Sequence, residues 1–401
     1  MLRAALARAG RAATGPGTRA GRLAAPGRGG AAAPPTAPRG AATFAGAPEI
    51  FDERRKALQR DRASPYALSP DPLQDEVAEG LLSRLQDVAR SFQNVLVVGG
   101  AGPRVVARLG RLGVPRVTYI DAAPGMLDMA GTGWREATRN AGEIVRGRED
   151  DDAEGAPQGP SAPPAPEPAP PPPPPLLRLV PWPVNSAMPI VPGTYDAVLC
   201  CLGMHWSNDV ELLLAQCRFA LIPDGFFLGA LLGGDTLSEL RASCMAASQE
   251  RLGGVSPRTS PLARVRDAGN MLSASGLAIP TVDVDDVIVA YESPAHLIRH
   301  LARLAETAAR GAAAPDPGPL PRDVALATAA AYVASYGPEV GGAGVDPDVP
   351  FAAVPATYQA IYLAGWAPAP GQAKAARRGS ATASFDDIKA YLGDGEDEEN
   401  K

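Results

Sequence analysis

Residues 94–121, NVLVVGGAGPRVVARLGRLGVPRVTYID, decide the fold of this chain. A β-branched apolar run is interrupted by glycines between residues 99 and 102, and apolar residues then recur at helical spacing as far as Leu112. An extended pattern resumes at Val117 and ends on Asp121. This order is typical of a nucleotide-binding unit, because glycine backbone lets a ligand approach a helix N-terminus and the acid accepts ribose hydroxyls. The alternative is a tight turn without a ligand, and Asp121 favours the binding site.

The composition indicates one packed domain with unpacked additions. The 401 residues include 43 Pro and 43 Gly, and the proline share is about twice the usual one. The net charge of -6, with no basic stripe after the N-terminal region, argues against nucleic acid as the principal partner. The four cysteines form no CxxC pair, so we expect reduced core residues. No apolar run is long enough to span a bilayer, and any membrane contact is expected to be peripheral.

The first 48 residues have the composition of a targeting segment. They contain seven arginines and no acidic residue, spread among alanine, glycine and proline. Such N-termini are typical of transit peptides, so we expect residues 1–48 to be disordered and the mature protein to begin near residues 43–51. A basic arm for nucleic acid is the alternative. Composition alone does not separate a mitochondrial from a plastid destination.

Low-complexity segments divide the rest of the chain. Residues 49–92 contain a charged helix followed by an amphipathic helix, which we expect at the edge of the sheet. Residues 146–175 are acidic and then proline-rich, which predicts a disordered insertion, with a polyproline segment that docks a partner as the alternative. Residues 311–321 and 337–350 are predicted loops, and residues 393–401 an acidic, solvated tail.

Extended segments alternate with helical ones along the core domain, residues 93–392. Besides the two strands above, the predicted strands are residues 176–180, 195–201, 226–232, 281–291 and 356–366. The spacing in the last of these also fits a helix, but its aromatic content favours a strand. The pattern predicts a doubly wound, Rossmann-like α/β sheet of seven strands. Residues 237–274 and 294–336 are expected to form a helical cap.

Five motifs resemble those of one known family. They are IFDERRKALQR at residues 50–60, YDAVLCCLGMHWSNDVE at 195–211, PDGFFLGALLGGDTLSELR at 223–241, VPATYQAIYLAGW at 354–366 and RGSATASFDDI at 378–388. The chain resembles the mitochondrial complex I assembly factor with a class I methyltransferase fold, the arginine-hydroxylase type. That factor is itself similar to the malonyl-carrier methyltransferase of biotin synthesis. The resemblance implies a protein of the mitochondrial matrix, or peripheral to the inner membrane, that hydroxylates an arginine of a complex I subunit during assembly.

The resemblance also implies a site for S-adenosylmethionine. It assigns Gly99 to the cofactor loop, Asp121 to the ribose hydroxyls and Met188 to the adenine side. The other implied cofactor contacts are Gly100, Gly102, Ala122, Asn185 and Cys201.

The cofactor loop departs from the family's pattern at three positions. Val97 stands where the family has an acid that meets the cofactor's amino group, and Ala101 and Pro103 stand where it has glycines. Because a lost charged hydrogen bond costs about 1.5–3 kcal/mol, we expect binding that is weak but real.

His205 and Asp209 follow the predicted strand at residues 195–201, at the end where open α/β sheets bind ligands. If methyl transfer occurs, the protein mainly aligns a nucleophile with the sulfonium, and a nearby base takes the substrate's proton. We therefore expect His205 and Asp209 to be the catalytic groups. The alternative is that His205 caps a helix and covers the pocket, and the residues do not decide between the two.

The histidine content bears on oxygenase chemistry. An iron oxygenase site typically needs two histidines and a carboxylate, and the chain has three histidines in all. His296 and His300 fall on a helix with an expected packing or solvent role, so no metal site is predicted. Two other functions stay open, namely S-adenosylmethionine-dependent methylation of a small molecule or protein, and a non-catalytic assembly scaffold with an eroded cofactor site.

Overall fold

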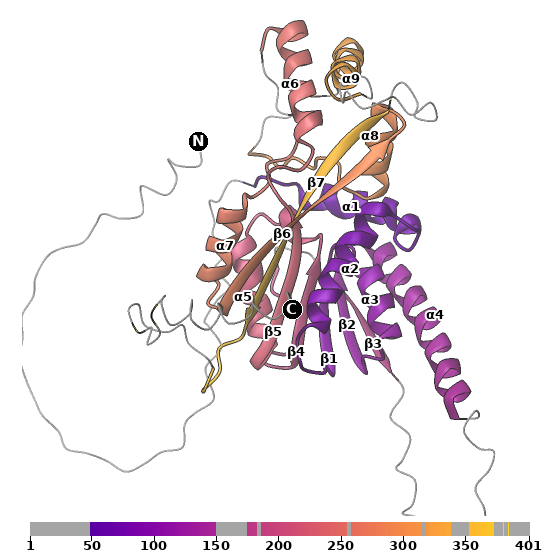
Figure 1. Cartoon of the computed structure of the whole chain (residues 1–401), viewed down its shortest axis with the longest axis vertical. Helices are drawn as coiled ribbons and strands as arrows, with labels where there is room; N and C mark the ends of the chain where they lie inside the picture. The colour runs from indigo at the N-terminus through magenta and orange to yellow at the C-terminus, as the bar shows by residue number, and fades with distance from the viewer. Residues whose placement is uncertain are drawn as a thin grey trace, which may run out of the picture. The chain divides into compact units, whose positions relative to one another are not determined.

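Seven strands form one sheet in the order β3-β2-β1-β4-β5-β7-β6 (Figure 1). The structure, a computed structural model, describes residues 49–149, 175–182, 186–254, 258–313, 318, 320–337, 353–372, 380 and 384. The strands are β1 (Asn94–Val98), β2 (Arg116–Asp121), β3 (Leu176–Pro181), β4 (Tyr195–Cys201), β5 (Leu221–Leu232), β6 (Ala278–Tyr291) and β7 (Val354–Trp366). Strands β1 to β5 pair in parallel, and β7 runs antiparallel to β5 and β6. The predicted seven-stranded α/β fold is confirmed.

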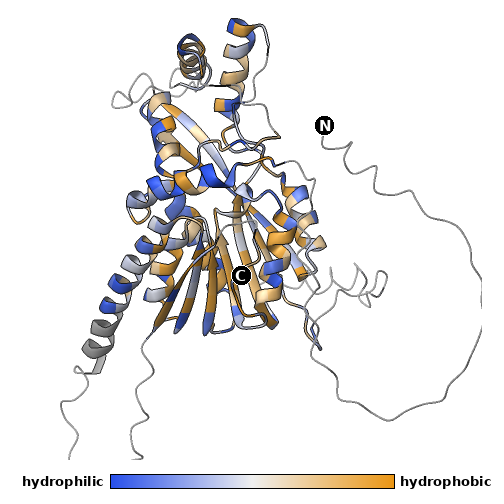
Figure 2. Cartoon of the chain, turned by 180° about the vertical axis from the view of Figure 1, so that it is seen from behind, coloured by the Kyte–Doolittle hydropathy of each residue, from blue (hydrophilic) through white to orange (hydrophobic). Residues whose placement is uncertain are grey.

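The central strands are apolar and covered on both faces (Figure 2). Every residue of β4 is buried, as expected for a parallel strand between two helical layers. One core cluster lies under α2 (Pro72–Gln86), α3 (Gly102–Arg111) and α4 (Pro124–Glu149). The other lies under α5 (Val210–Ala220) and α7 (Val265–Ala274). Strands β1 and β4 therefore send their following helices to opposite faces, which opens a crevice at their carboxyl ends.

A cap of helices lies over that end of the sheet (Figure 1). It consists of α1 (Glu53–Ala63), α6 (Ser238–Leu252), α8 (Pro294–Arg303) and α9 (Arg322–Tyr336), with the short helices η2 (Ser64–Tyr66) and η3 (Met204–Trp206) beneath it. Helix α6 packs on α9, and α8 contacts both α1 and α9. The cap thus draws on the N-terminal helix and on the later half of the chain.

The positions of two helices differ from the prediction, one wholly and one in part. Helix α7, expected in the cap, packs beside α5 against β6 and β7. Helix α2, expected at the sheet edge, does contact the edge strand β6, and it extends from there across the sheet face to β7, β5 and β4. An apolar stripe shows that a helix buries one side, but it does not identify the surface that covers the stripe.

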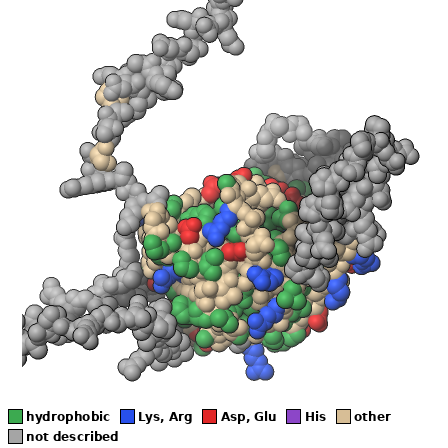
Figure 3. Space-filling model, turned by 90° about the horizontal axis from the view of Figure 1, so that it is seen from below, with side chains coloured by type: hydrophobic (Ala, Val, Ile, Leu, Met, Phe, Trp, Pro, Cys, Tyr) green, Lys and Arg blue, Asp and Glu red, His purple; other side chains and the backbone are tan. Residues whose placement is uncertain are grey.

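Helix α4 continues to Glu149, past residue 146 where the insertion was predicted to begin. Residues 1–48, 150–174, 338–350 and 393–401, which hold the predicted transit peptide, most of two low-complexity segments and the tail, lie outside the described residues. None of the helices that the structure describes has the length and apolar content needed to cross a membrane. On the part of the lower face that Figure 3 shows in colour, basic, acidic and apolar side chains are interspersed.

Candidate functional site

The glycine loop between β1 and α3 contains three glycines with different tasks. Gly99 and Gly100 have φ of +53° and +60°, in the left-handed region that favours glycine. A Cβ on Gly100 would lie 1.7 Å from the carbonyl oxygen of Cys201, and one on Gly102 would lie 2.1 Å from the ring of Tyr119. A Cβ on Gly99 would meet nothing within 4 Å. Two of the glycines therefore permit packing, and Gly99 leaves open space for a ligand.

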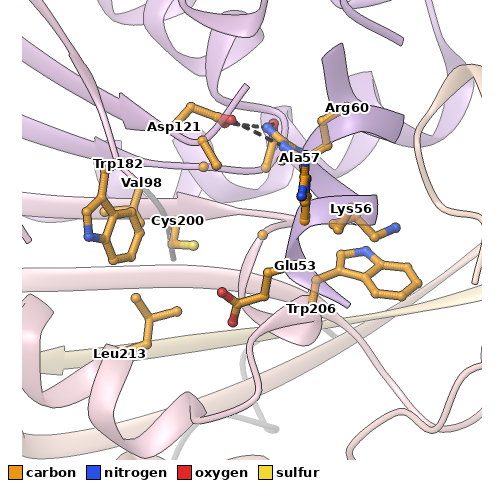
Figure 4. Close-up of a pocket in the computed structure, with 15 residues that line it drawn as sticks. Glu53, Lys56, Ala57, Arg60, Val98, Asp121, Trp182, Cys200, Trp206 and Leu213 are labelled. Carbon is orange, nitrogen blue, oxygen red and sulfur yellow. Dashed lines mark hydrogen bonds and ion pairs between the residues drawn. The ribbon is translucent and has the colours of Figure 1, made fainter. Parts of the chain in front are cut away.

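That open space belongs to a cavity of about 330 Å³, the first cavity (Figure 4). Its walls come from the glycine loop, the carboxyl ends of β2 and β4, and α1. Val98, Trp182, Cys200 and Leu213 form an apolar side. The cavity thus lies at the point where the strand order reverses, the usual ligand position in this type of sheet.

Asp121 ends β2 at the wall of the first cavity and is almost wholly buried. Its carboxylate accepts hydrogen bonds from the Tyr119 hydroxyl at 2.6 Å and the Ala123 amide at 2.8 Å. Arg60 of α1 forms an ion pair with it at 2.5 Å (Figure 4). The Arg60 guanidinium also donates to the Gly100 carbonyl at 2.7 Å. The guanidinium therefore bridges the two elements that are expected to hold a cofactor.

The buried Arg60 guanidinium stays charged because it is paired with the Asp121 carboxylate. Burial alone would lower the pKa of Arg60, but the Asp121 carboxylate raises it above its ordinary value. Burial, together with the same carboxylate, raises the pKa of Tyr119, so this hydroxyl keeps its proton and remains a donor. Ribose hydroxyls need acceptor positions on Asp121 that Arg60 now fills, so a nucleoside that uses Asp121 must displace the guanidinium.

A polar partition stands beside the first cavity and is built around Glu306. This carboxylate accepts hydrogen bonds from Trp206 Nε1 at 2.9 Å and from His205 Nε2 at 3.0 Å. The Leu232 amide donates to His205 Nδ1 at 3.4 Å, which makes Nδ1 the acceptor and Nε2 the protonated nitrogen. Burial would raise the pKa of Glu306, but His205 and Lys56 lower it. The partition therefore carries a charged carboxylate.

Lys56 closes the partition from the α1 side. Its ammonium lies 3.1 Å from the centroid of the Trp206 ring and donates to the carbonyls of Ala305, at 2.5 Å, and Thr307, at 3.1 Å. Ala305 has φ of +60°, a conformation that is costly for a residue other than glycine and that tends to occur at functional sites. Burial lowers the pKa of Lys56 to about 7, and Glu306 opposes the shift only in part. A buried amine that titrates near neutrality beside a cavity is a candidate acid–base group.

The structure brings four of the predicted site residues together. Gly99, Gly100, Asp121 and Ala122 all line the first cavity. Asn185 lies outside the described residues. The placement of these residues agrees with a nucleotide-like ligand over the glycine loop.

Three predicted cofactor contacts do not line the first cavity. Gly102 packs against Tyr119. Cys201 points into the core and offers only its carbonyl, which accepts from the Ala101 amide, while its neighbour Cys200 lines the cavity. Met188 packs in the core cluster on the α5 face, and its amide donates to Gln216.

The two predicted catalytic residues also lie off the cavity wall. His205 is buried with both ring nitrogens engaged, an arrangement that agrees with its covering role more closely than with that of a base. Asp209 is the N-cap of α5 and accepts from the Leu212 amide at 2.8 Å. A residue at a strand's carboxyl end reaches the crevice only when its side chain points there, which sequence position alone does not fix.

The sequence-based prediction missed α1 as a wall of the site. Glu53, Lys56 and Arg60 recur at the three- and four-residue spacing that places side chains on one helix face, and this pattern was a usable signal. Glu306 gave no such signal, because its partner His205 is 101 positions away. Among the described residues, no cluster of three or more His, Cys, Asp or Glu side chains is arranged to hold a metal ion.

Comparison with known proteins gives the chain its relatives. No family model matches it. The mitochondrial arginine-hydroxylase NDUFAF5 of Danio rerio is 34% identical over 341 residues, covering 84% of this chain and 89% of the relative. The malonyl-[acyl-carrier protein] O-methyltransferase of Laribacter hongkongensis is 26% identical over 328 residues, covering 79% and 90%. The solved structure of the YcgJ protein from Bacillus subtilis aligns with a TM-score of 0.42 and 13% identity, covering 73% of this chain and 99% of that one. The extent and identity of the match to the Danio rerio protein show that this chain belongs to the mitochondrial arginine-hydroxylase NDUFAF5 family.

Proposed function

We propose that this chain hydroxylates an arginine of a complex I subunit during assembly of the complex in the mitochondrial matrix. The proposed reaction, arginine hydroxylation, is the one for which the relatives are named. The proposed substrate, a subunit of complex I, follows from the motif resemblance described above. The main structural support for the proposal is the first cavity, where the glycine loop and Asp121 face α1. We propose the same cavity as the site of S-adenosylmethionine.

The residues of the first cavity fit this cofactor with one condition. The space beyond Gly99 admits close contact with a ligand's backbone-facing atoms. Asp121 would accept the ribose hydroxyls once Arg60 has moved, and the apolar wall at Val98, Trp182 and Leu213 suits a purine ring. When bound, S-adenosylmethionine supplies a methyl group activated by a sulfonium centre.

The chain's own groups position and protect the reaction. Helix α1 covers the cavity and limits access of water, since Arg60 binds the glycine loop and Asp121 while Lys56 binds the loop that follows α8. Trp206 and Glu306 hold the partition rigid. Lys56 fastens this cover to the loop after α8, because its ammonium donates to the carbonyls of Ala305 and Thr307.

Hydroxylation replaces a C–H bond by a C–OH bond. With dioxygen as the oxygen donor, the second oxygen atom leaves as water, and two electrons and two protons are consumed. We therefore expect in vitro turnover only when dioxygen and an external reductant are supplied.

Methylation is the second candidate function. The open Gly99 loop opposite the buried Asp121 is suited to a nucleoside ligand such as S-adenosylmethionine, and the similarity to a malonyl-[acyl-carrier protein] O-methyltransferase favours use of its methyl group. The substrate nitrogen or oxygen would then bond to the methyl group as the methyl–sulfur bond breaks, S-adenosylhomocysteine would leave as the neutral thioether, and the substrate's proton would pass to a base or to water.

One experiment separates these functions. Complex I subunits are isolated from cells that lack this protein and from cells that express the wild type, Asp121→Asn or Asp128→Asn, and their arginines are compared by mass spectrometry. Asp128 is an exposed residue of α4 and gives a matched control. We expect one arginine to carry an added oxygen atom with the wild type and Asp128→Asn, and to lack it otherwise. An added methyl group in place of the oxygen atom would support methylation instead of hydroxylation. If cells that express Asp121→Asn assemble complex I normally without any arginine modification, the protein acts only as an assembly scaffold.

A further inference from the structure

A second cavity, of about 180 Å³, lies on the other side of the Trp206–Glu306 partition. Its walls come from the carboxyl end of β5, the start of α6, residues 258–262, α8 and Tyr358 of β7. Arg241, Thr259 and Leu262 are shared with an open cleft of about 520 Å³ at the surface. A ligand can therefore reach the partition from the cap side without passing through the first cavity.

Arg258 is the unusual residue of this second cavity. One terminal nitrogen donates to the Gly318 carbonyl at 2.8 Å, which fixes the side chain. Its Nε is buried and has no hydrogen-bond partner. Within the described ranges, no carboxylate lies within ion-pair distance of this guanidinium. Arg258 as a whole is half-buried, but its buried Nε–H lacks an acceptor in the protein and so indicates an acceptor from outside.

Arg241 adds a second positive charge to the same wall. It donates to the carbonyls of Gly234 and Thr236 and to the Thr259 hydroxyl, at 3.0, 3.1 and 3.3 Å. All three acceptors are neutral, and none of the described carboxylates pairs with Arg241. The hydrogen bonds hold the guanidinium in place without balancing its charge.

The acidic group of the second cavity does not balance these arginines. Glu306 lies at the partition, where its carboxylate is already bound by His205 and Trp206 and compensated by Lys56. The wall near the two arginines is therefore positive.

We propose that the second cavity binds a short organic carboxylate, with Arg258 as its charged donor and the Thr259 and Ser260 hydroxyls beside it. The remaining wall is mostly aliphatic, including Leu237, Leu240 and Leu301, which favours an organic body over an inorganic ion. The volume suits a few carbon atoms and is too small for a nucleotide. The carboxylate can belong to a free organic acid or to a glutamate side chain of a protein substrate that lies in the open cleft. The site is independent of the proposed function, because binding requires no turnover.

The test measures binding to the full chain by calorimetry and thermal unfolding. The probes are glutarate, inorganic phosphate, and a blocked peptide with a single glutamate beside its glutamine counterpart. The variants are Arg258→Met, Arg258→Lys, which keeps the charge but lacks the Nε donor, and Arg251→Met, an exposed control on α6. We expect glutarate or the glutamate peptide to bind the wild type and Arg251→Met equally, and Arg258→Met at least about tenfold more weakly.

The outcomes separate the sources of the carboxylate. Binding of the glutamate peptide but not of its glutamine counterpart assigns the carboxylate to a substrate side chain, and binding of glutarate alone assigns it to a free acid. If Arg258→Met unfolds, a loss of affinity in Arg258→Lys carries the same conclusion. The proposal is overturned if neither carboxylate probe binds the wild type, if phosphate binds as tightly as glutarate, or if the Arg258 variants retain full affinity. None of these results depends on arginine modification, so they leave the proposed function to its own experiment.

Discussion

Asp121 is held by an internal cation, so its availability to a ligand depends on one side chain. The Arg60 guanidinium fills acceptor positions on the carboxylate that ribose hydroxyls would use. Arg60 thus stabilises the ligand-free protein and competes with ligand binding at the same carboxylate oxygens of Asp121.

Replacing Arg60 by Met is expected to have opposite effects on stability and on cofactor response. Removing one partner of a buried pair costs about 3 kcal/mol, near the low end because Tyr119 and Ala123 still donate to Asp121. The freed carboxylate should give a larger S-adenosylmethionine-induced rise in Tm than in the wild type. Denaturant titration and thermal unfolding with and without the cofactor measure both effects. Arg62→Met, exposed on the same helix, should change neither, and an unchanged cofactor response in Arg60→Met would contradict the competition.

Lys56 makes stability depend on pH in a defined window. Its pKa falls from 10.5 in the unfolded chain to about 7 in the folded protein. Between these values the unfolded state binds one more proton, so stability rises with pH, by up to about 1.4 kcal/mol per pH unit. Below pH 7 both states are protonated and the slope vanishes. Comparing the wild type with Lys56→Met by urea unfolding from pH 6 to 9.5 isolates this contribution from the cysteines and tyrosines, and parallel curves would exclude it.

At the scale of elements, α1 is the helix that we expect to open away from the first cavity most readily, because polar contacts hold it in place. Its N-cap is Asp52, whose carboxylate accepts from the Arg55 amide at 2.9 Å. Phe51 is tied by two hydrogen bonds to Asn208 and by a bridge to Arg310. The apolar face of α1 is small, since only Lys56 and Ala63 of the helix are buried. Its opening therefore involves breaking hydrogen bonds more than exposing core.

Asp52→Ala should loosen α1 without unfolding the sheet. Loss of an N-cap costs about 1 kcal/mol, which should accelerate hydrogen exchange of the α1 amides by about fivefold and leave β1 and β4 unchanged. Asn also caps helices well, so Asp52→Asn is the matched control and should exchange like the wild type. Equal acceleration across the whole sheet would show that α1 opens only with global unfolding.

At the scale of the whole molecule, the cysteines report which parts open first. All four are free and buried, as predicted, but Cys244 belongs to α6 in the cap and the others to the sheet and α5. Burial raises the pKa of Cys200 to about 12, so this thiol is unreactive while it is folded. Alkylation of the native protein followed by mass spectrometry should label Cys244 before Cys200, Cys201 and Cys217. Labelling of Cys217 first would show that the sheet opens before the cap.

Much of the sheet could be predicted because its signals are local. The apolar runs of β1 and β4, the glycine loop and Asp121 each occupy a few consecutive residues, and their order fixes the crevice. Gly99 and Asp121 were placed at the crevice for this reason, and both line the first cavity.

The other half of the site could not be predicted because its contacts are distant in the chain. Arg60 meets Asp121 across 61 positions, and Trp206 meets Glu306 across 100. Spacing shows which side chains share a helix face but not what that face covers. His205 was expected at the cavity for its chemistry, yet its orientation is set by the Leu232 amide and Glu306.

The hydrogen bond from Lys56 to the Ala305 carbonyl spans 249 positions and fastens the cover of the first cavity to the loop that follows α8. Most of the polypeptide must therefore be present before that cover has anything to fasten to. A chain that ends before residue 305 would leave the glycine loop with a roof that lacks this anchor.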